Sequence, residues 1–296
     1  MKKITLLYML FTGALLMQAQ HTKPVLKYIN AITTETNYKQ AGVVGIKITY
    51  KYNFLPLEEL THNDSILRDA TFNIATKIYE NNKALEPATG YQLSADLNGD
   101  IIYNLSLYSS DVKASVSDKQ KSIFIPYAAL KLSEGTHTIT VIAELTGTDG
   151  TGAKHHQKVE KAATTFNKPA TQTATFNIDY IEVNTLNAKG KAWDYSIFRT
   201  DAPDVGVILN LANTIVWKNH VNDTYMFAVG PKSQNIIFTI SKGDIITLDV
   251  NDIDVMFHDY VANLTFSTKD KKPGQLYAYD TAKGNIKACK MTFKID

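Results

Sequence analysis

The residues best suited to chemistry are carboxylates in the second half of the chain. Asp252, Asp254 and Asp259 form a D-x-D-x4-D pattern directly after an apolar segment, 244–250, that alternates as a strand does. Side chains two apart on a strand point to the same side, so Asp252 and Asp254 should lie together. Because like charges repel, such a pair favours a cation between them, and Ca²⁺ accepts six to eight oxygen ligands in a flexible shell. The spacing therefore predicts a Ca²⁺ site.

A second acidic group precedes an earlier predicted strand. Asp194 opens a loop that follows Gly190, and Asp201 and Asp204 close it just before the apolar run 205–209. We expect these three carboxylates to meet the first group at one end of a domain. The alternative is that all six are ordinary turn residues, since Asp is common in turns for local hydrogen-bonding reasons.

The elements that must position these residues are predicted to be strands. Residues 43–52 alternate with period two, which places Ile46, Ile48 and Tyr50 on one face. Similar runs recur through both halves, with turn clusters such as Asn98-Gly99 between them. A sustained helical period is missing from the sequence. The pattern indicates an all-β protein built of two antiparallel β-sandwich domains.

The predicted boundary lies in a polar, Thr-rich segment with one proline. We interpret residues 164–173 as a linker, with a sandwich domain over residues 20–163 and another over residues 174–296. Both are close to the usual domain size.

The order of features in the second half resembles the C2 domain, an eight-stranded antiparallel sandwich whose apical loops gather aspartates around Ca²⁺. The features are the strand 176–183, the acidic loop before Pro203-Asp204-Val205, a strand carrying Trp217, and the final V-N-D-I-D and H-D-Y-V segments. The resemblance covers roughly residues 174–296 and implies a metal-ligand role for a set of aspartates: Asp194 in the first loop, Asp204 at the start of the second strand, and Asp252, Asp254 and Asp259 in the third loop, with Asp201 able to substitute in the long first loop.

Besides the long first loop, the sequence departs from the C2 pattern in two respects. Ala262 stands where a Gly usually follows the last Asp, and the loops carry few basic residues, which weakens the expectation of anionic-lipid binding.

The first nineteen residues are predicted to be a secretory signal peptide. Lys2 and Lys3 precede an apolar run from Ile4 to Met17, and Ala19 is the expected last residue removed. The run is too short for a transmembrane helix, which needs about 20 apolar residues. The single Cys289 cannot form an internal disulfide and lies in a predicted strand as a small buried side chain. We therefore expect an exported protein, periplasmic, associated with the outer envelope or secreted, that is stabilised by its hydrophobic cores.

The composition narrows the possible functions. The 31 basic and 29 acidic residues give a net charge of +2, without the basic stripe of a nucleic-acid-binding protein. The preferred hypothesis is a non-catalytic interaction module on the cell envelope, stabilised by Ca²⁺, whose partner is a protein or a lipid head group. The first alternative is a structural or assembly protein without a metal. The second is a hydrolase with a carboxylate pair, for which the sequence shows no cleft-building insertion.

Overall fold

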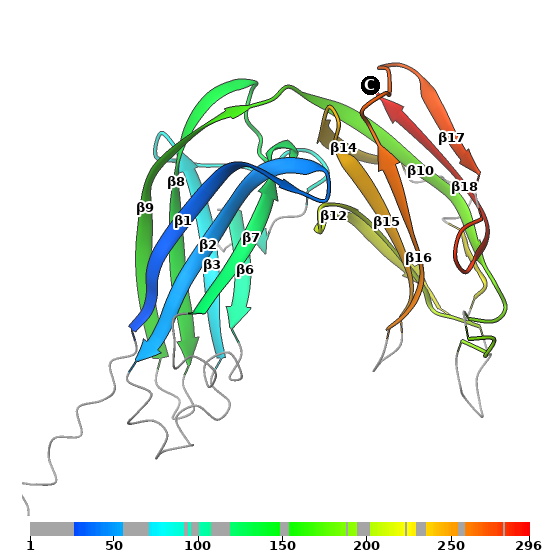
Figure 1. Cartoon of the computed structure of the whole chain (residues 1–296), viewed down its shortest axis with the longest axis horizontal. Coiled ribbons are helices and arrows are strands. Elements are labelled where there is room, and N and C mark those ends of the chain that lie inside the picture. The colour runs from blue at the N-terminus through cyan, green and yellow to red at the C-terminus, as the bar shows by residue number, and fades with distance from the viewer. Residues whose placement is uncertain are drawn as a thin grey trace, which may run out of the picture.

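The computed structural model describes residues 27–55, 71–91, 94–95, 101–107, 119–148, 154–187, 189–193, 202–222, 224–228, 235–253, 258–280 and 282–296. The predicted signal peptide lies outside this part. The described residues form strands and one short 3₁₀ turn, η1 (Tyr127–Ala129). The prediction of an all-β protein with two antiparallel sandwiches is confirmed (Figure 1). Across the described residues, we find no helix long and apolar enough to cross a membrane.

The first sandwich packs two antiparallel sheets around one core. One sheet has the order β1-β2-β7, and the other has the order β5-β6-β3-β8-β9, with β4 paired to β3. The bounds are β1 (Lys27–Gln40), β2 (Val43–Leu55), β3 (Thr71–Glu80), β4 (Lys83–Ala84), β5 (Ser94–Ala95), β6 (Ile101–Leu107), β7 (Lys119–Pro126), β8 (Gly135–Thr148) and β9 (Lys154–Lys168).

The second sandwich has the same two-layer construction. One sheet has the order β13-β10-β18-β17, with β14 also paired to β10, and the other has the order β12-β11-β15-β16. The bounds are β10 (Thr171–Val183), β11 (Val205–Leu211), β12 (Thr214–Val221), β13 (Met226–Ala228), β14 (Ile236–Ser241), β15 (Ile245–Ile253), β16 (His258–Ser267), β17 (Leu276–Asp280) and β18 (Ile286–Ile295).

Period-two alternation explains most of the burial. In β2, Ile46, Ile48 and Tyr50 are fully buried, as predicted. In β10, the buried positions shift from Phe176 and Ile178 to Ile181, because the register with β18 is irregular between Ile178 and Tyr180. An extra residue at such a bulge moves the following side chains to the opposite face. One strand thus presents even positions to the core at its start and odd positions at its end.

The connection between the sandwiches differs from the predicted linker. Residues 164–173 are in strand conformation except Pro169 and Ala170, so β9 passes almost directly into β10, which arches over the top of the molecule (Figure 1). Lys168 is buried, and its ammonium group donates to Thr171 Oγ1 at 3.3 Å. Burial lowers the pKa of Lys168, and the nearby carboxylate of Glu134 opposes this effect. Thr-rich composition was misleading here, since Thr is also a good strand former.

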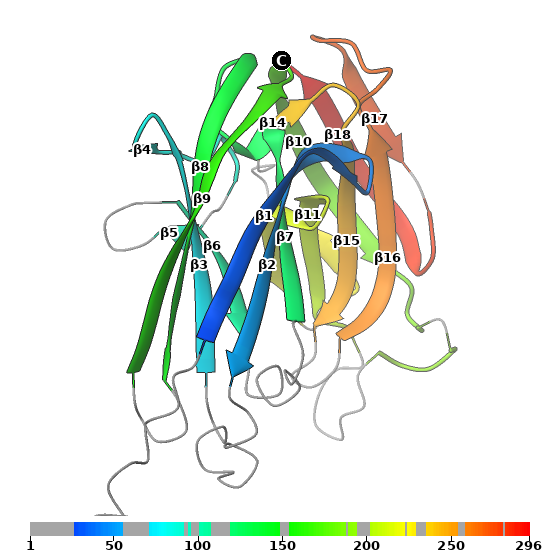
Figure 2. The same ribbon diagram turned by 60° about the vertical axis from the view of Figure 1, so that its left-hand side comes forward.

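The two sandwiches also contact each other through residues outside the connection. The tip of the β1–β2 hairpin reaches the second sandwich, where Gln40 Nε2 donates to the carbonyl oxygen of Ala212 at 3.1 Å. Val43, at the same tip, is fully buried within the core cluster of the second sandwich. The hairpin (blue) is seen reaching across in Figure 2.

A second contact covers the edge of β14. Tyr91 OH donates to the carbonyl oxygen of Thr239 at 2.7 Å, and Thr239 N donates to the carbonyl oxygen of Thr89 at 3.0 Å. Gly90 has φ +88°, and a Cβ atom built on it would lie 2.4 Å from Phe238 Cβ. We call these two contact regions together the junction. The junction constrains the position of one sandwich relative to the other, in addition to the β9–β10 connection.

Candidate functional site

One end of the second sandwich gathers three of the six predicted aspartates. Asp204 lies directly before β11, Asp252 near the end of β15, and Asp259 near the start of β16. The antiparallel registers pair Val205 with Asp252, and Asp252 with Asp259. The backbone therefore brings these three positions to the same edge of the sheet. We call this edge the acidic end.

Asp252 is held by the backbone of the neighbouring strand. Its side chain is fully buried, and Oδ1 accepts a hydrogen bond from the backbone N–H of Asp204 at 2.8 Å. The carbonyl oxygen of Asp204 in turn accepts the N–H of Ile253 at 2.9 Å. A buried carboxylate that accepts a backbone N–H stabilises the ends of two strands, so Asp252 has a structural role whether or not a cation binds.

The other predicted ligands lie outside the described residues. These are Asp194, Asp201 and Asp254, and the side chain of Asp259 is also outside the description. Within the described part of the chain, no three His, Cys, Asp or Glu side chains converge as a metal site would require. Among the six predicted ligands, Asp204 and Asp252 are the two whose side chains the structure describes.

These two carboxylates fit Ca²⁺ only in part. They are oxygen ligands of the kind that Ca²⁺ prefers, but one oxygen of Asp252 already accepts the N–H of Asp204. Most of a shell of six to eight oxygens would have to come from the other aspartates of the two loops and from water.

The outer face of the same sheet carries a polar ladder that the sequence analysis did not identify. Asp249 Oδ2 accepts from Asn210 Nδ2 at 2.7 Å, and Asp249 Oδ1 accepts from Asn263 Nδ2 at 2.5 Å. The three residues come from β11, β15 and β16, so this carboxylate links three adjacent strands. Both of its oxygens are used within the sheet, which makes it a structural residue. Polar residues at alternating positions of predicted strands would have been the signal.

The opposite end of β15 holds a second buried carboxylate, Asp244. It is 2 % exposed, and Oδ2 accepts the N–H of Ser241 at 2.7 Å. Sequence reasoning placed Asp244 at the start of a strand but gave its side chain no role. The turn Ser241-Lys242-Gly243-Asp244 was a local signal, because Asp and Gly favour such turns. The contact of Asp244 with the first sandwich had no signal in the sequence.

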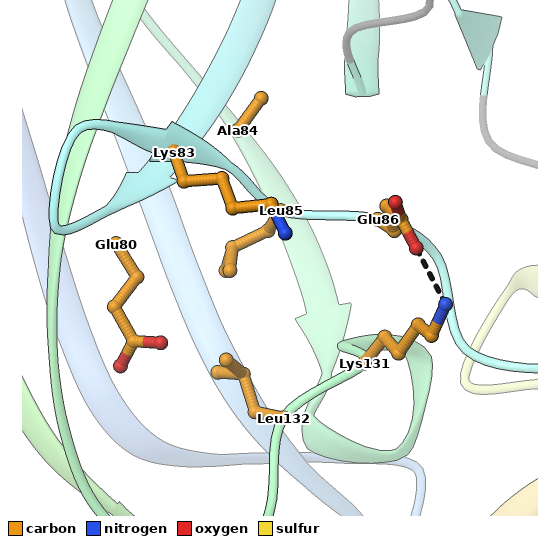
Figure 3. A pocket seen from close by; sticks show the side chains of 7 residues that line it. All are labelled: Glu80, Lys83, Ala84, Leu85, Glu86, Lys131 and Leu132. Atoms are coloured by element: carbon orange, nitrogen blue, oxygen red, sulfur yellow. Dashed lines mark hydrogen bonds and ion pairs between the residues drawn. The ribbon is translucent and has the colours of Figure 1, made fainter.

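The first sandwich contains a hollow of about 360 Å³ beside β4 (Figure 3). Lys131 and Glu86 form an ion pair at its rim, drawn as a dashed line in Figure 3, and this pair lowers the pKa of Glu86. Glu80, at the other side, is hydrogen-bonded to His137 Nδ1 at 2.6 Å. The carboxylates at this hollow are therefore already paired with cationic or donor groups of the same domain.

A neighbouring hollow of about 410 Å³ lies at the junction. It is lined by Ala88 and Thr89 from the first sandwich, by Thr171 and Thr239 from the second, and by residues 130–133. Its hydroxyl groups and small side chains form a polar recess between the domains. Lys131 is the ionisable group in this lining, and it is paired with Glu86.

Of the comparisons with known proteins, the one with solved structures found similar chains. No family model and no curated protein matches the sequence. Among solved structures, one described as "Structure of a C2 domain" is similar at 13% sequence identity, over 43% of this chain and 98% of that chain, with a TM-score of 0.29.

Proposed function

We propose that the protein is a non-catalytic interaction module, exported to the cell envelope, that contacts a protein or a lipid head group through the acidic end of its second sandwich. The observation that carries this proposal is the convergence of Asp204, Asp252 and Asp259 at strand ends. The junction is at the other end of β15, roughly 26 Å away at about 3.3 Å per residue. The contacts that form the junction are therefore far from the acidic end along β15.

We further propose that Ca²⁺ binds at the acidic end. Asp204 and Asp252 would hold it from the described residues, and the remaining oxygens would come from Asp194, Asp201, Asp254 and Asp259. The ion would neutralise the repulsion between these carboxylates and add a positive charge that a carboxylate or phosphate of a partner could approach. Two unit charges about 4 Å apart repel by about 4 kcal/mol at an effective dielectric constant of 20, so the benefit of neutralisation is substantial.

A structural or assembly role without metal is the second candidate, and a specific contact favours it. Asp252 already has a function as the acceptor of the Asp204 N–H, which explains a buried carboxylate without a cation. In this alternative, the acidic end is a set of strand-terminating residues. The two candidates make opposite predictions for Ca²⁺.

The deciding experiment measures thermal unfolding of the full mature chain in chelator, in Ca²⁺ and in Mg²⁺. If Ca²⁺ binds only the folded state, a concentration 100 times Kd should stabilise it by about 2.7 kcal/mol, which raises Tm by several degrees. Mg²⁺ should do less, because it requires a tight octahedral shell. Identical curves in all three conditions would favour the structural candidate.

Variants make this test specific to the acidic end. Asp252→Asn removes the charge but keeps an oxygen that can accept the N–H of Asp204, so the fold should persist while the Ca²⁺ effect is lost. Asp280→Asn, at an exposed position at the end of β17, is the matched control and should keep the Ca²⁺ effect. Loss of the effect in both variants would mean that Ca²⁺ acts elsewhere on the protein.

A further inference from the structure

One carboxyl group of the second sandwich is buried beside the place where the first sandwich packs against it. Asp244 lies in the β14–β15 turn of the second sandwich, next to the point where the β1–β2 hairpin of the first sandwich meets it. Its carboxyl group accepts the backbone N–H of Ser241, in its own turn, at 2.7 Å, and the backbone N–H of Val44, in β2, lies close enough to lower its pKa. This side chain therefore lies at the contact between the two domains.

The packing around Asp244 excludes water. The residue is 2 % exposed, and the adjacent Ile245 side chain packs against Gly42, where a Cβ atom would lie 2.3 Å from Ile245 Cδ1. The main chain of Asp244 is fixed within the second sandwich, because its N–H donates to the Ser241 carbonyl oxygen and its own carbonyl oxygen accepts the N–H of Thr268. The hairpin of the first sandwich packs beside the carboxyl group, where Gly42 meets Ile245 and the Val44 N–H lies near, so it contributes to the burial of this group.

The electrostatic balance at this position disfavours the charged form. Burial is the largest influence and raises the pKa of Asp244 from 3.8 to about 7, although the N–H groups of Ser241 and Val44 oppose it. The segments packed around the carboxyl group also carry ionisable side chains of their own, namely Tyr38, Lys39 and Lys47 on the hairpin, Lys242 in the turn, and Lys269 and Asp270 after Thr268. Burial and the backbone N–H groups of Ser241 and Val44 are the causes of the pKa shift. The charges of the neighbouring side chains therefore do not offset the effect of burial.

We propose that Asp244 makes the junction a pH-responsive joint, closed when its carboxyl group is protonated and loosened when the group is ionised. The physical reason is that an ionised carboxylate gains hydration when the hairpin moves away, whereas a neutral carboxyl group gains much less. Withdrawal of the hairpin would remove the Val44 N–H and the cover of Gly42. It would also expose Val43, whose burial in the core of the second sandwich opposes opening. The β9–β10 connection would keep the domains attached.

The test measures the distance between the domains directly. In the full mature chain with Cys289→Ser, nitroxide labels on Lys158→Cys in β9 and Lys218→Cys in β12 report the interdomain distance distribution by electron spin resonance. Both positions are exposed, and Cys289 is buried, so its replacement prevents stray labelling. We expect a narrow distribution at about pH 5 and a broader or displaced one at about pH 9, on either side of the transition of Asp244.

Two variants assign the effect to Asp244. Asp244→Asn keeps an oxygen acceptor but cannot ionise, so its distribution should be narrow at both pH values. Asp270→Asn, in the exposed turn after Thr268, is the matched control and should respond to pH as the parent does. A parent distribution that does not change with pH, or an Asp244→Asn variant that changes as the parent does, would overturn the proposal. If that variant does not fold, the carbon-13 shift of the Asp244 carboxyl group in the parent decides, and a transition near its ordinary value of 3.8 would overturn it.

Discussion

Replacing Asp244 with Asn should change how the stability of the whole protein depends on pH. The pKa of this buried carboxyl group is raised from 3.8 to about 7 by burial. A folded-state pKa above the unfolded value means that the native state binds the proton more tightly. The stabilisation is therefore fully present below the unfolded pKa of 3.8 and is lost as the pH rises through about 7.

The magnitude follows from the size of the rise. At 1.36 kcal/mol per pH unit, the difference between 3.8 and about 7 corresponds to roughly 4 kcal/mol of unfolding free energy. Opening of the junction lets water reach the carboxylate and reduces this cost, so on the order of 2 to 4 kcal/mol is expected. The free energy of unfolding should fall between about pH 4 and about pH 8, and it should level off above that range.

Urea unfolding followed by tryptophan fluorescence measures this effect. Both Trp193 and Trp217 lie in the second half of the chain, so the signal reports the domain that contains Asp244. Because Asn is neutral at every pH, the Asp244→Asn variant should lack this part of the decline and be the more stable protein at about pH 9. The difference between the two proteins isolates Asp244 from the other titrating groups. Parallel curves, or a stability difference that grows toward low pH, would refute the reasoning.

Three further substitutions test individual contacts by urea unfolding. Gly90→Ala should lower the free energy of unfolding by about 1 to 3 kcal/mol, because the new Cβ atom would meet Phe238 and the backbone has φ +88°. An unchanged urea midpoint would show that the neighbouring atoms move aside without loss of stability. Tyr50→Phe should lower the free energy of unfolding by about 1 to 3 kcal/mol, since it removes the hydroxyl partner of the buried Thr76. An unchanged free energy would mean that the Thr76 hydroxyl forms a hydrogen bond with another group. Asp252→Ala should cost more than Asp252→Asn, because only Ala removes the acceptor of a backbone N–H; equal costs would argue that the charge, not the hydrogen bond, is what the fold uses.

The strands and the two-sandwich class were predictable from the sequence by itself. Alternation with period two fixes which side chains of a strand face the core, as in β2 with Ile46, Ile48 and Tyr50. This information is local, because each strand carries its own pattern. The arrival of Asp204, Asp252 and Asp259 at one edge was also predictable, since strand ends in a known topology must meet there. Whether Ca²⁺ binds at that edge stays a prediction.

Only the tertiary structure decided how the two sandwiches are joined. Composition suggested a linker, yet strands β9 and β10 continue almost without interruption, because Thr suits an extended strand as well as a loop. The contact of Asp244 with the first sandwich could not be predicted either. Val44 is two hundred residues away in sequence and approaches the carboxyl group with its backbone N–H, which every residue but proline possesses. A contact through a backbone N–H does not depend on the residue type, so the sequence does not indicate it. Only the folded structure shows which backbone group lies near the carboxyl group.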